Sequence, residues 1–529
     1  MKKYIKLVLL SAGTLFVSCD NDLLEPYTPG QNTEEVALKT STDLGNLMNS
    51  AYANISSRSE AVDVSVFTDE VSIGFGNGGQ GISDDYVFLM NPGSSLPQNI
   101  WANSYAALAR INRVIKYADI IVPSNAADAQ VIARIKAQAL TMRAYCHLRL
   151  LAYFTTDMKD NNALAAIISD RVFATTESQN LRATNGAFYS LIHSDLNAAI
   201  SLYTANPTAF SNVIANEVFA KGLKARAYAY KGDYTNALIY ANDVISSGLV
   251  LATPAQYRQV FFSDNQPVNA EVIFKLRRTP VQNAQASNLH NGWVSLQPNL
   301  AGSPFYEMSR SLHNVLNPAN LPATHPTDPN VTTLPDVRAN VNIAPSSVID
   351  AGYLTSTDIR NTDKIVINKH GGTASGTTTW ATTAANTNNN DFKIMRLSEM
   401  YLIRAEAYAD AANLNLSMAA ANIKSIRDAR FGAAQTAPVY SSAAQAWAGI
   451  LNERRIEFSY EGYRFIDLKR LGTLAGQGID RHPADYNASS ANYPGANPAN
   501  LPLNSFKWAL PIPQIEINVN KVIQQNPGY

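Results

Sequence analysis

The stretch ILNERRIEFSYEGYRFIDLKRLG, residues Ile450 to Gly472, decides how the rest of this chain is interpreted. It contains nine charged side chains among aromatic and aliphatic ones, although only 16% of the whole chain is charged. We predict two short helices here. The first runs to about Tyr460, Gly462 forms the turn, and the second ends at Gly472, because glycine readily adopts the left-handed conformation that closes a helix.

The charges of this stretch are spaced so that they can pair along helix faces. Glu453 and Glu457 are one turn apart, and Arg464 and Asp467 are three residues apart. Opposite charges three residues apart on one helix can meet. The stretch contains no nucleophile beside a base and no set of metal ligands. We therefore interpret it as a structural network of ion pairs between packed helices.

Composition limits the class of protein. A chain of 529 residues forms one large unit or a few smaller ones, and 46% hydrophobic residues rule out wholesale disorder. The 42 basic residues equal the 42 acidic ones, so no electrostatic argument favours nucleic acid as a partner. Tyrosine is abundant, with 25 copies. Its flat apolar face and hydroxyl suit both helix packing and surfaces that face sugars.

The N-terminus has the features of an export signal. Residues 1–18 begin with three lysines and continue as an apolar run that is shorter than the ~20 residues of a membrane span. The run ends in Phe16-Val17-Ser18-Cys19, which resembles a bacterial lipobox with Phe16 in place of the usual leucine. We predict a signal peptide over 1–18, lipidation of Cys19, and a polar, extended tether over 19–40.

A lipidated Cys19 leaves Cys146 as the only other cysteine of the chain, which excludes a disulfide framework. Cys146 lies in MRAYCHLRLLAYF, where we expect it to be a small buried hydrophobic residue. No second apolar segment approaches membrane-spanning length, so the lipid anchor alone is expected to hold the mature protein at the membrane.

Apolar residues recur at three- and four-residue steps in several segments, and this spacing predicts helices. The expected helices are residues 41–57, 99–121, 128–155, 185–204, 216–231, 235–247, 393–410 and 417–430. Gly232-Asp233-Tyr234 joins two of them in a hairpin of the tetratricopeptide kind. Such hairpins cannot bury a core alone, so several must stack. The predicted fold is mainly α, built from tetratricopeptide-like hairpins with a few short β-strands.

Residues 252–390 differ from this helical pattern because they are rich in loops. AEVIFKLRR (270–278) and KIVINK (364–369) are the expected strands. Residues 371–390 form a low-complexity insert of Thr, Asn and Gly that holds Trp380. Long loops within a compact domain are either functional or disordered.

Catalytic motifs are weak in this sequence. GFGNGG, residues 74–79, has dinucleotide-site spacing, but QGISDDYVF after it does not start a helix, so we interpret it as a surface loop. The seven histidines are scattered without zinc-site spacing. We predict no metal, no cofactor and no catalytic residue. A glycoside hydrolase stays an alternative, because its two carboxylates must face each other ~5–10 Å apart, which sequence does not reveal.

A binding surface is the remaining functional interpretation. Sugar sites combine flat aromatic rings with polar side chains, because a sugar has apolar C–H faces and hydroxyl edges. For Trp101, which lies on an apolar helical stripe, packing in the core is the alternative. The candidate ligand-binding residues are Asp69, Tyr86, Trp101, Trp293, Tyr306 and Trp380.

Segments along the chain, in the same order as in the family, resemble the SusD/RagB family of outer-membrane nutrient-binding lipoproteins. These segments are the Cys19 lipobox, WANSYAALARINRVI, MRAYCHLRLLAYF, KARAYAYKGDYTNALIYANDVISSG, NAEVIFKLRR, LPDVRANV, MRLSEMYLIRAEAYADA, Ile450–Gly472 and PIPQIEINVNKVIQQNPGY. The resemblance implies one SusD-like domain over 41–529, with an N-terminal helical part to about 250 and a C-terminal part from 251. It also implies four tetratricopeptide-like units and a loop-rich ligand face.

The resemblance further implies a function. Relatives lie over a SusC-like TonB-dependent transporter of the outer membrane and deliver glycans or, in some members, peptides to it. Trp101 resembles a tryptophan at a helix start that contributes to the ligand face in some relatives, and Asp69 resembles an acidic position of the family. The leading hypothesis is a surface glycan-binding lipoprotein. The alternatives are a peptide-binding relative, a surface glycoside hydrolase and a purely structural adaptor.

Overall fold

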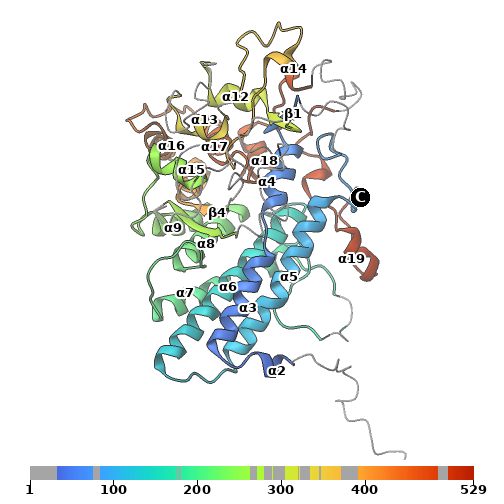
Figure 1. Cartoon of the computed structure of the whole chain (residues 1–529), viewed down its shortest axis with the longest axis vertical. Coiled ribbons are helices and arrows are strands. Elements are labelled where there is room, and N and C mark those ends of the chain that lie inside the picture. Colours follow the sequence, from blue (N-terminus) through green and yellow to red (C-terminus); the bar gives the residue numbers. More distant parts are fainter. Residues whose placement is uncertain are drawn as a thin grey trace, which may run out of the picture.

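A computed structural model describes residues 33–75, 84–174, 177, 180–262, 271–278, 289, 293, 304–319, 321, 334–344, 347–370, 391–486 and 498–529. The predicted signal peptide, Cys19 and Trp380 lie outside the described residues. Helices dominate the molecule, with a bundle of long helices at one end and a loop-rich region at the other (Figure 1).

The helices are α2 (Glu34–Ala37), α3 (Ser41–Asn54), α4 (Arg58–Phe67), α5 (Ser95–Ala118), α6 (Ala126–Phe154), α7 (Asn185–Ala205), α8 (Glu217–Lys231), α9 (Tyr234–Ile245), α10 (Pro254–Phe262), α12 (Arg310–Leu316), α13 (Val337–Asn342), α14 (Ile359–Thr362), α15 (Leu397–Ala409), α16 (Leu416–Phe431), α17 (Ala443–Phe458), α18 (Arg464–Ala475) and α19 (Gln514–Val519). Short 3-10 turns are η5 (Ala411–Asn413), η6 (Pro483–Tyr486) and η7 (Phe506–Trp508). The strands are β1 (Val71–Ile73), β2 (Val272–Leu276), β3 (Tyr306–Met308) and β4 (Phe392–Arg396).

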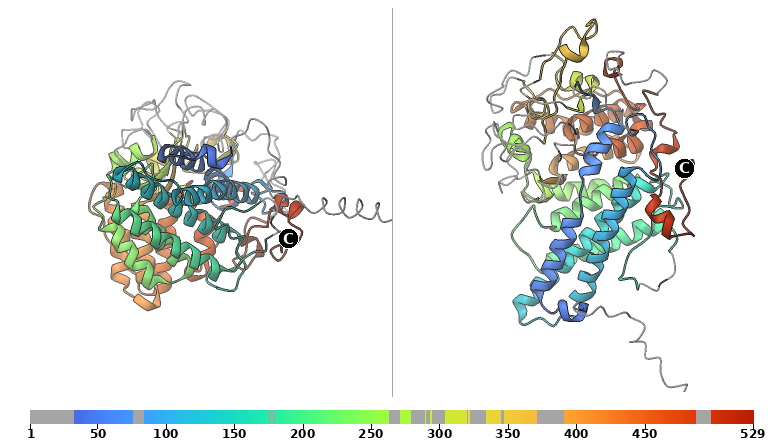
Figure 2. Two further views of the ribbon diagram at one scale, coloured as in Figure 1. Left: turned by 90° about the horizontal axis from the view of Figure 1, so that it is seen from below. Right: turned by 45° about the vertical axis from the view of Figure 1, so that its right-hand side comes forward.

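Helix pairs stack in chain order along the molecule. Helix α6 packs on α7, α8 on α9, α15 on α16, and α17 on α18. The pairs are linked because α7 also packs on α8, α9 on α15, and α16 on α17. Within the described residues this makes a continuous row of four helical pairs, visible side by side from below (Figure 2). The predicted mainly-α fold with tetratricopeptide-like hairpins is confirmed.

Local sequence explains where these helices begin and end. Thr40 and Asp43 form a reciprocal capping box at the start of α3. Asn216 accepts a hydrogen bond from the amide of Phe219 at 2.9 Å, which caps α8. Gly232 ends α8 with φ of +80°, in agreement with the predicted Gly232-Asp233-Tyr234 turn.

The interior contains one large apolar cluster that extends from Leu44 to Ile512. Cys146 of α6 lies fully buried in it, and burial raises the pKa of its thiol to about 12. The interpretation of Cys146 as a small buried hydrophobic residue is confirmed. Among the described residues, no helix combines the length and the apolar content that crossing a bilayer requires.

Two small antiparallel sheets join distant parts of the chain. Strands β1 and β3 pair with Val71 opposite Met308 and Ile73 opposite Tyr306. Strands β2 and β4 pair with irregular register from Val272 opposite Arg396. The first sheet therefore connects the segment after α4 to the loop-rich region.

Several predicted boundaries were wrong. Residues 392–396 form β4 rather than the start of a helix, because they pair with β2. Residues 364–369 form isolated bridges at Lys364 and Ile367 instead of a strand. The tether is not extended throughout, since α2 lies within 33–40.

The second helix of the opening stretch also differs from its prediction. Helix α18 continues past Gly472 to Ala475, and Gly476 ends it with φ of +61°. Gly472 lies inside the helix, where a Cβ atom would come within 2.6 Å of Leu503. Its small size therefore serves close packing rather than helix termination.

Candidate ligand-binding face

The loop-rich end of the molecule contains a small cavity, which we call the outer cavity, between segments that are far apart in the sequence. Residues of β1 and β3, of α12 and α14, and of the region around η6 line it. Figure 1 shows β1, α12 and α14 at this end of the molecule. The outer cavity has a volume of about 50 Å³. Its lining residues are Ser72, Ile73, Gly74, Glu307, Met308, Arg310, Ile359, Asp363, Ile365, Ala484 and Asp485.

A second cavity, of about 80 Å³, which we call the inner cavity, lies in the helical body between α6, α8 and the turn from α17 to α18. Charged side chains in its wall are paired with each other or with near neighbours. Arg149 pairs with Glu60, and Arg226 pairs with Glu399 through two hydrogen bonds of 2.7 and 2.5 Å. This inner cavity is therefore part of the packed scaffold, and the outer cavity is the better candidate for a ligand.

An aromatic ring is fixed beside the outer cavity by a guanidinium group. Arg310 is the first residue of α12, and its guanidinium carbon lies 3.7 Å from the centre of the Tyr353 ring. Its Nη2 donates to the carbonyl of Asp350 at 3.1 Å, which holds the turn that carries Tyr353. A cation against an aromatic face is attractive, so Arg310 fixes the orientation of this ring.

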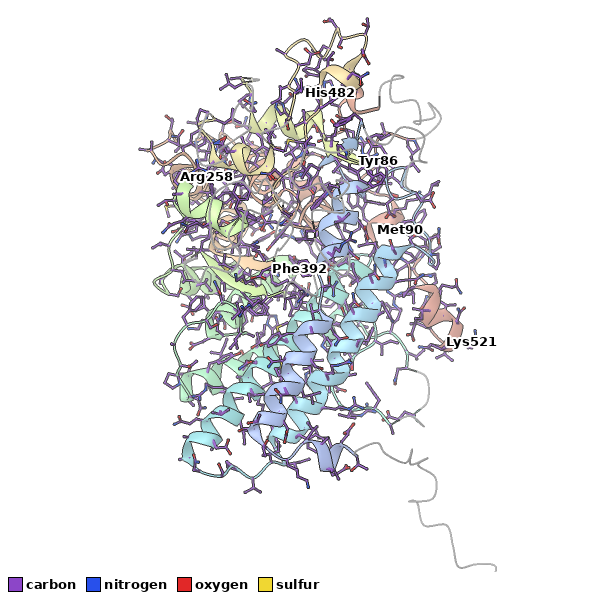
Figure 3. The ribbon with its side chains drawn as sticks, viewed as in Figure 1. Tyr86, Met90, Arg258, Phe392, His482 and Lys521 are labelled. Atoms are coloured by element: carbon purple, nitrogen blue, oxygen red, sulfur yellow. The ribbon has the colours of Figure 1, made fainter. Side chains whose placement is uncertain are left out.

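Polar groups surround the edge of the same ring. The Tyr353 hydroxyl accepts a hydrogen bond from Asn314 at 3.0 Å, and the ring of His482 meets the Tyr353 ring edge to face at 5.4 Å. Tyr353 is half-buried, and His482 lies at the loop-rich end (Figure 3). A flat ring held rigidly among hydrogen-bonding side chains is the combination that sugar-binding sites use.

Two buried carboxylates line the outer cavity, and backbone amides hold both of them. Glu307 accepts from the amides of Phe75 and Ile365, and Asp485 accepts from those of Arg310 and His482. Burial raises the pKa of Glu307 to about 8 and that of Asp485 to about 7. These groups therefore change charge near neutral pH. In the part of the chain that the structure describes, no group of His, Cys, Asp or Glu is arranged to hold a metal ion.

The predicted ligand residue Asp69 lies in the interior instead. Its carboxylate is fully buried and accepts hydrogen bonds from Arg464 at 2.8 and 2.7 Å. The amide of Asp480 donates to it at 2.9 Å, and Arg455 lies 3.6 Å away. Burial opposes its ionisation, but the guanidinium groups of Arg455 and Arg464 outweigh that effect and hold the pKa of Asp69 well below its usual range.

Tyr86 and Trp293 are also buried completely, so their expected position on the surface was wrong. The Tyr86 ring lies 4.0 Å from the guanidinium of Arg481, which also donates to the last carbonyls of α4. The Trp293 ring stacks on His370 at 5.6 Å, and its Nε1 donates to Ser65 at 2.9 Å. Both rings complete the packing beneath the loops.

Trp101 is buried as well, and it lies in the second turn of α5 rather than at the helix start. Its ring meets Phe154 edge to face at 4.9 Å, and its Nε1 donates to Glu516 at 3.2 Å. The alternative interpretation, packing in the core, therefore describes its surroundings. Tyr306 remains a candidate, because it is half-buried on β3 next to the outer cavity, while Trp380 lies outside the described residues.

Tyr353, which the sequence analysis did not select, is the aromatic residue best placed for a ligand. Its partner Arg310 lies 43 positions away in the sequence, and no motif connects the two. The available signal was weak: a tyrosine in the polar loop 350–358 without an apolar periodicity around it.

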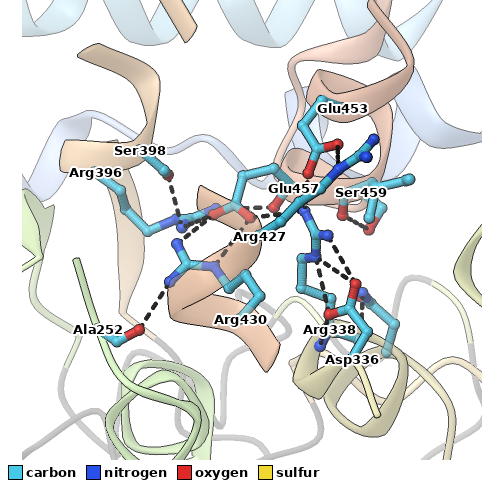
Figure 4. A network of polar contacts seen from close by, with 12 residues as sticks. Ala252, Asp336, Arg338, Arg396, Ser398, Arg427, Arg430, Glu453, Glu457 and Ser459 are labelled. Carbon is cyan, nitrogen blue, oxygen red and sulfur yellow. Dashed lines mark hydrogen bonds and ion pairs between the residues drawn. The ribbon is translucent and has the colours of Figure 1, made fainter. Parts of the chain in front are cut away.

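The opening stretch forms a buried network of ion pairs (Figure 4). Glu457 pairs with Arg396 at 2.6 Å and with Arg430 at 2.7 Å, and Glu453 pairs with Arg338 at 2.7 Å. Figure 4 shows these side chains converging from separate helices and loops. The interpretation as a structural network between packed helices is confirmed.

One detail of that interpretation was wrong. Arg464 and Asp467 do not pair along the face of α18. Arg464 reaches Asp69, whereas Asp467 pairs with Arg454 at 2.8 Å and with Arg470 at 3.4 Å. Most of these charges therefore join different elements of the fold rather than neighbours on one helix.

Two protein-family models match this sequence. The model described as SusD family matches residues 325–529, and the model described as starch-binding, associating with the outer membrane, matches residues 24–229. A comparison with curated proteins found no match.

Solved structures share the fold of the whole chain. A SusD superfamily protein from Bacteroides thetaiotaomicron VPI-5482 is 23% identical, with 92% of this chain and 100% of that chain covered and a TM-score of 0.68. A SusD superfamily protein from Bacteroides vulgatus ATCC 8482 is 21% identical, with 93% and 99% covered and a TM-score of 0.69. A laminarin-binding SusD-like protein is 21% identical, with 93% and 100% covered and a TM-score of 0.61. At these identities the likeness shows the fold.

Proposed function

This chain belongs to the SusD/RagB family, and from that premise we propose that it is a lipid-anchored protein of the outer-membrane surface that captures glycans. It passes them to a SusC-like TonB-dependent transporter. The match of both halves of the chain to SusD-type models is the observation that carries this proposal. One of those models is described as starch-binding, and the structural neighbour named above is described as laminarin-binding.

We place the ligand at the loop-rich end, against the half-buried ring of Tyr353. The guanidinium of Arg310 holds this ring from one side at 3.7 Å, so little side-chain freedom is lost when a sugar binds. Asn314 lies at the hydroxyl of the ring and His482 lies beside the ring, and both can hydrogen-bond to sugar hydroxyl groups. Tyr306 on the adjacent strand is the second aromatic candidate.

Isothermal titration against a panel of polysaccharides, oligosaccharides and oligopeptides tests the proposal, with starch and laminarin included. We expect saturable binding to at least one glycan, and Tyr353→Ala to weaken it by roughly tenfold, as losing an aromatic stacking partner does. Tyr401→Ala is the matched control, because Tyr401 is also half-buried beside an arginine, Arg404, at 5.0 Å, but on the helical body.

The possible results separate the alternatives. Binding to peptides without binding to any glycan would favour the peptide-binding relative and overturn the proposal. Release of shorter products from a bound polysaccharide would indicate a hydrolase. If Tyr353→Ala and Tyr401→Ala weaken glycan binding equally, the proposal of glycan capture stands, but the ligand does not bind against Tyr353.

A further inference from the structure

The inner cavity is lined by a buried carboxylate oxygen that has no hydrogen-bond partner among the described residues. This oxygen is Oε2 of Glu60, a residue of α4 that is only 6% exposed. The other oxygen of the same carboxylate, Oε1, accepts from the Nε of Arg149. A buried polar atom without a partner costs free energy, so Oε2 indicates a hydrogen-bond donor inside the cavity.

Two tyrosine hydroxyls at the same cavity also have no protein partner. Tyr145 of α6 and Tyr230 of α8 are buried and line the cavity. Within the described part of the chain, neither hydroxyl forms a hydrogen bond to the protein. By contrast, the hydroxyl of Tyr463, which lines the cavity too, donates to the carbonyl of Ile394 at 3.2 Å. The cavity therefore combines one acceptor with two groups that can both donate and accept.

The charges around the inner cavity are balanced, which argues against an ion as its occupant. Arg149 pairs with Glu60, and Arg226 pairs with Glu399. An additional anion would face the carboxylates of the lining, and an additional cation would face the basic groups, with little water to screen either. The charged lining residues are Glu60, Arg149, Arg226, Lys393 and Glu461. The occupant should therefore be a neutral molecule.

The volume of the cavity limits the size of that molecule. The inner cavity measures about 80 Å³. A cavity of ~150 Å³ holds a single benzene molecule, so a sugar ring with its hydroxyl groups is too large for this one. A water molecule occupies ~30 Å³ in the liquid, so about two or three of them fit. Water also donates and accepts, as the three polar groups require.

We propose that the inner cavity holds a cluster of about two or three ordered water molecules. They hydrogen-bond to Oε2 of Glu60 and to the hydroxyls of Tyr145 and Tyr230. Buried water molecules that complete the hydrogen bonding of such groups are costly to remove. This cluster lies where α4, α6 and α8 meet β4 and the turn before α18, so it stabilises the junction between these elements. The proposal does not depend on glycan capture at the outer cavity.

A high-resolution crystal structure of the mature chain with Cys19→Ser tests the proposal directly. The crystals should be grown without alcohols or polyols, so that water is the only small neutral molecule supplied. We expect separate density peaks within about 2.6–3.2 Å of Glu60 Oε2 and of the hydroxyls of Tyr145 and Tyr230. A cavity without density, one continuous organic molecule, or a peak with the coordination of an ion would each overturn the proposal.

Thermal unfolding of the same chain tests the proposal in solution. Tyr145→Phe and Tyr230→Phe each remove a hydroxyl that bonds to the water cluster, so each should lower the melting temperature by about 1–2 °C. Tyr257→Phe is the matched control. The Tyr257 hydroxyl is also buried without a partner among the described residues, but it does not line the cavity.

The control gives the comparison a sign. Removing a buried hydroxyl that has no partner is neutral or stabilising, so Tyr257→Phe should leave the melting temperature unchanged or raise it. If the inner cavity contains no water, Tyr145→Phe and Tyr230→Phe should behave in the same way. Equal shifts in all three variants, or a higher melting temperature in Tyr145→Phe, would therefore refute the water cluster.

Discussion

The carboxylate of Asp69 is fully buried and depends on two arginines for its charge. Removing Arg464 deletes both of its hydrogen bonds to this buried charge and leaves only Arg455, at 3.6 Å, and the amide of Asp480 to stabilise it. We predict that Arg464→Ala lowers the free energy of unfolding by about 3–5 kcal/mol, measured by chemical denaturation. Glycan affinity of the folded variant should be unchanged, because Arg464 does not line the outer cavity.

Arg427→Ala provides the matched control for this prediction. Arg427 also pairs with a buried carboxylate, that of Glu453, but its own side chain is 35% exposed. Glu453 keeps Arg338 as a partner. The expected cost is therefore about 1 kcal/mol or less. A folded Arg464→Ala protein without glycan binding would contradict a purely structural role for this residue.

Glu70, next to Asp69, makes the stability of the protein depend on pH. Burial raises the pKa of Glu70 to about 8, and the nearby charge of Asp69 adds to the effect. The folded state therefore keeps a proton that the unfolded state releases near pH 4.5. Its contribution to stability is full below pH 4.5 and declines as pH rises toward about 8.

We predict that Glu70→Gln reduces the loss of stability between about pH 5 and about pH 9, by roughly 4 kcal/mol. The amide carries no charge to bury, and its oxygen can still accept from the amide of Tyr460. Part of the pH dependence should persist, because burial raises the pKa of Glu307 and Asp485 in the same direction. Urea unfolding at both pH values measures the effect; an identical loss in the variant would show that Glu70 does not titrate in this range.

At the scale of elements, the turn between α17 and α18 depends on Gly462. Its φ is +86°, and a Cβ atom there would lie 2.9 Å from the backbone of Glu60 in α4. Gly476, which ends α18, has φ of +61° with nothing within 4 Å of a Cβ position. We predict that Gly462→Ala lowers the unfolding free energy by about 3 kcal/mol or more, and Gly476→Ala by about 1 kcal/mol. Similar melting temperatures for the two variants would refute the role of the α4 contact.

Most helices could be predicted from the sequence, because apolar residues that recur at three- and four-residue steps over a long segment fit a helix and do not fit a strand. Residues 392–396 were misassigned since their strand conformation depends on β2, which lies far earlier in the chain. The same limit applies to the site. The burial of Trp293 depends on its stacking with His370, and the position of Tyr353 depends on Arg310. Polar neighbours in the sequence do not reveal such contacts.

At the scale of the whole molecule, the C-terminal segment returns to the N-terminal helices. The amide of Leu510 donates to the carbonyl of Tyr153 at 2.8 Å, and the side chain of Asn526 donates to that of Phe154 at 2.8 Å. Both bonds satisfy carbonyl groups at the end of α6, which have no partner within the helix. The last residues of the chain are therefore fastened onto a helix that precedes the middle of the sequence.

Because the C-terminal segment is bonded to the N-terminal helices in this way, we predict that residues 41–529 unfold as one unit, although a chain of this size often contains separate domains. The apolar cluster from Leu44 to Ile512 crosses the expected division near residue 250, and so does the pair of Asp69 with Arg464. Neither part can therefore lose its structure without exposing the buried surface of the other. Calorimetry of the Cys19→Ser chain should show a single transition, which Arg464→Ala moves as a whole to lower temperature. Two separate transitions, or two folded fragments after proteolysis near residue 250, would instead establish independent N-terminal and C-terminal domains.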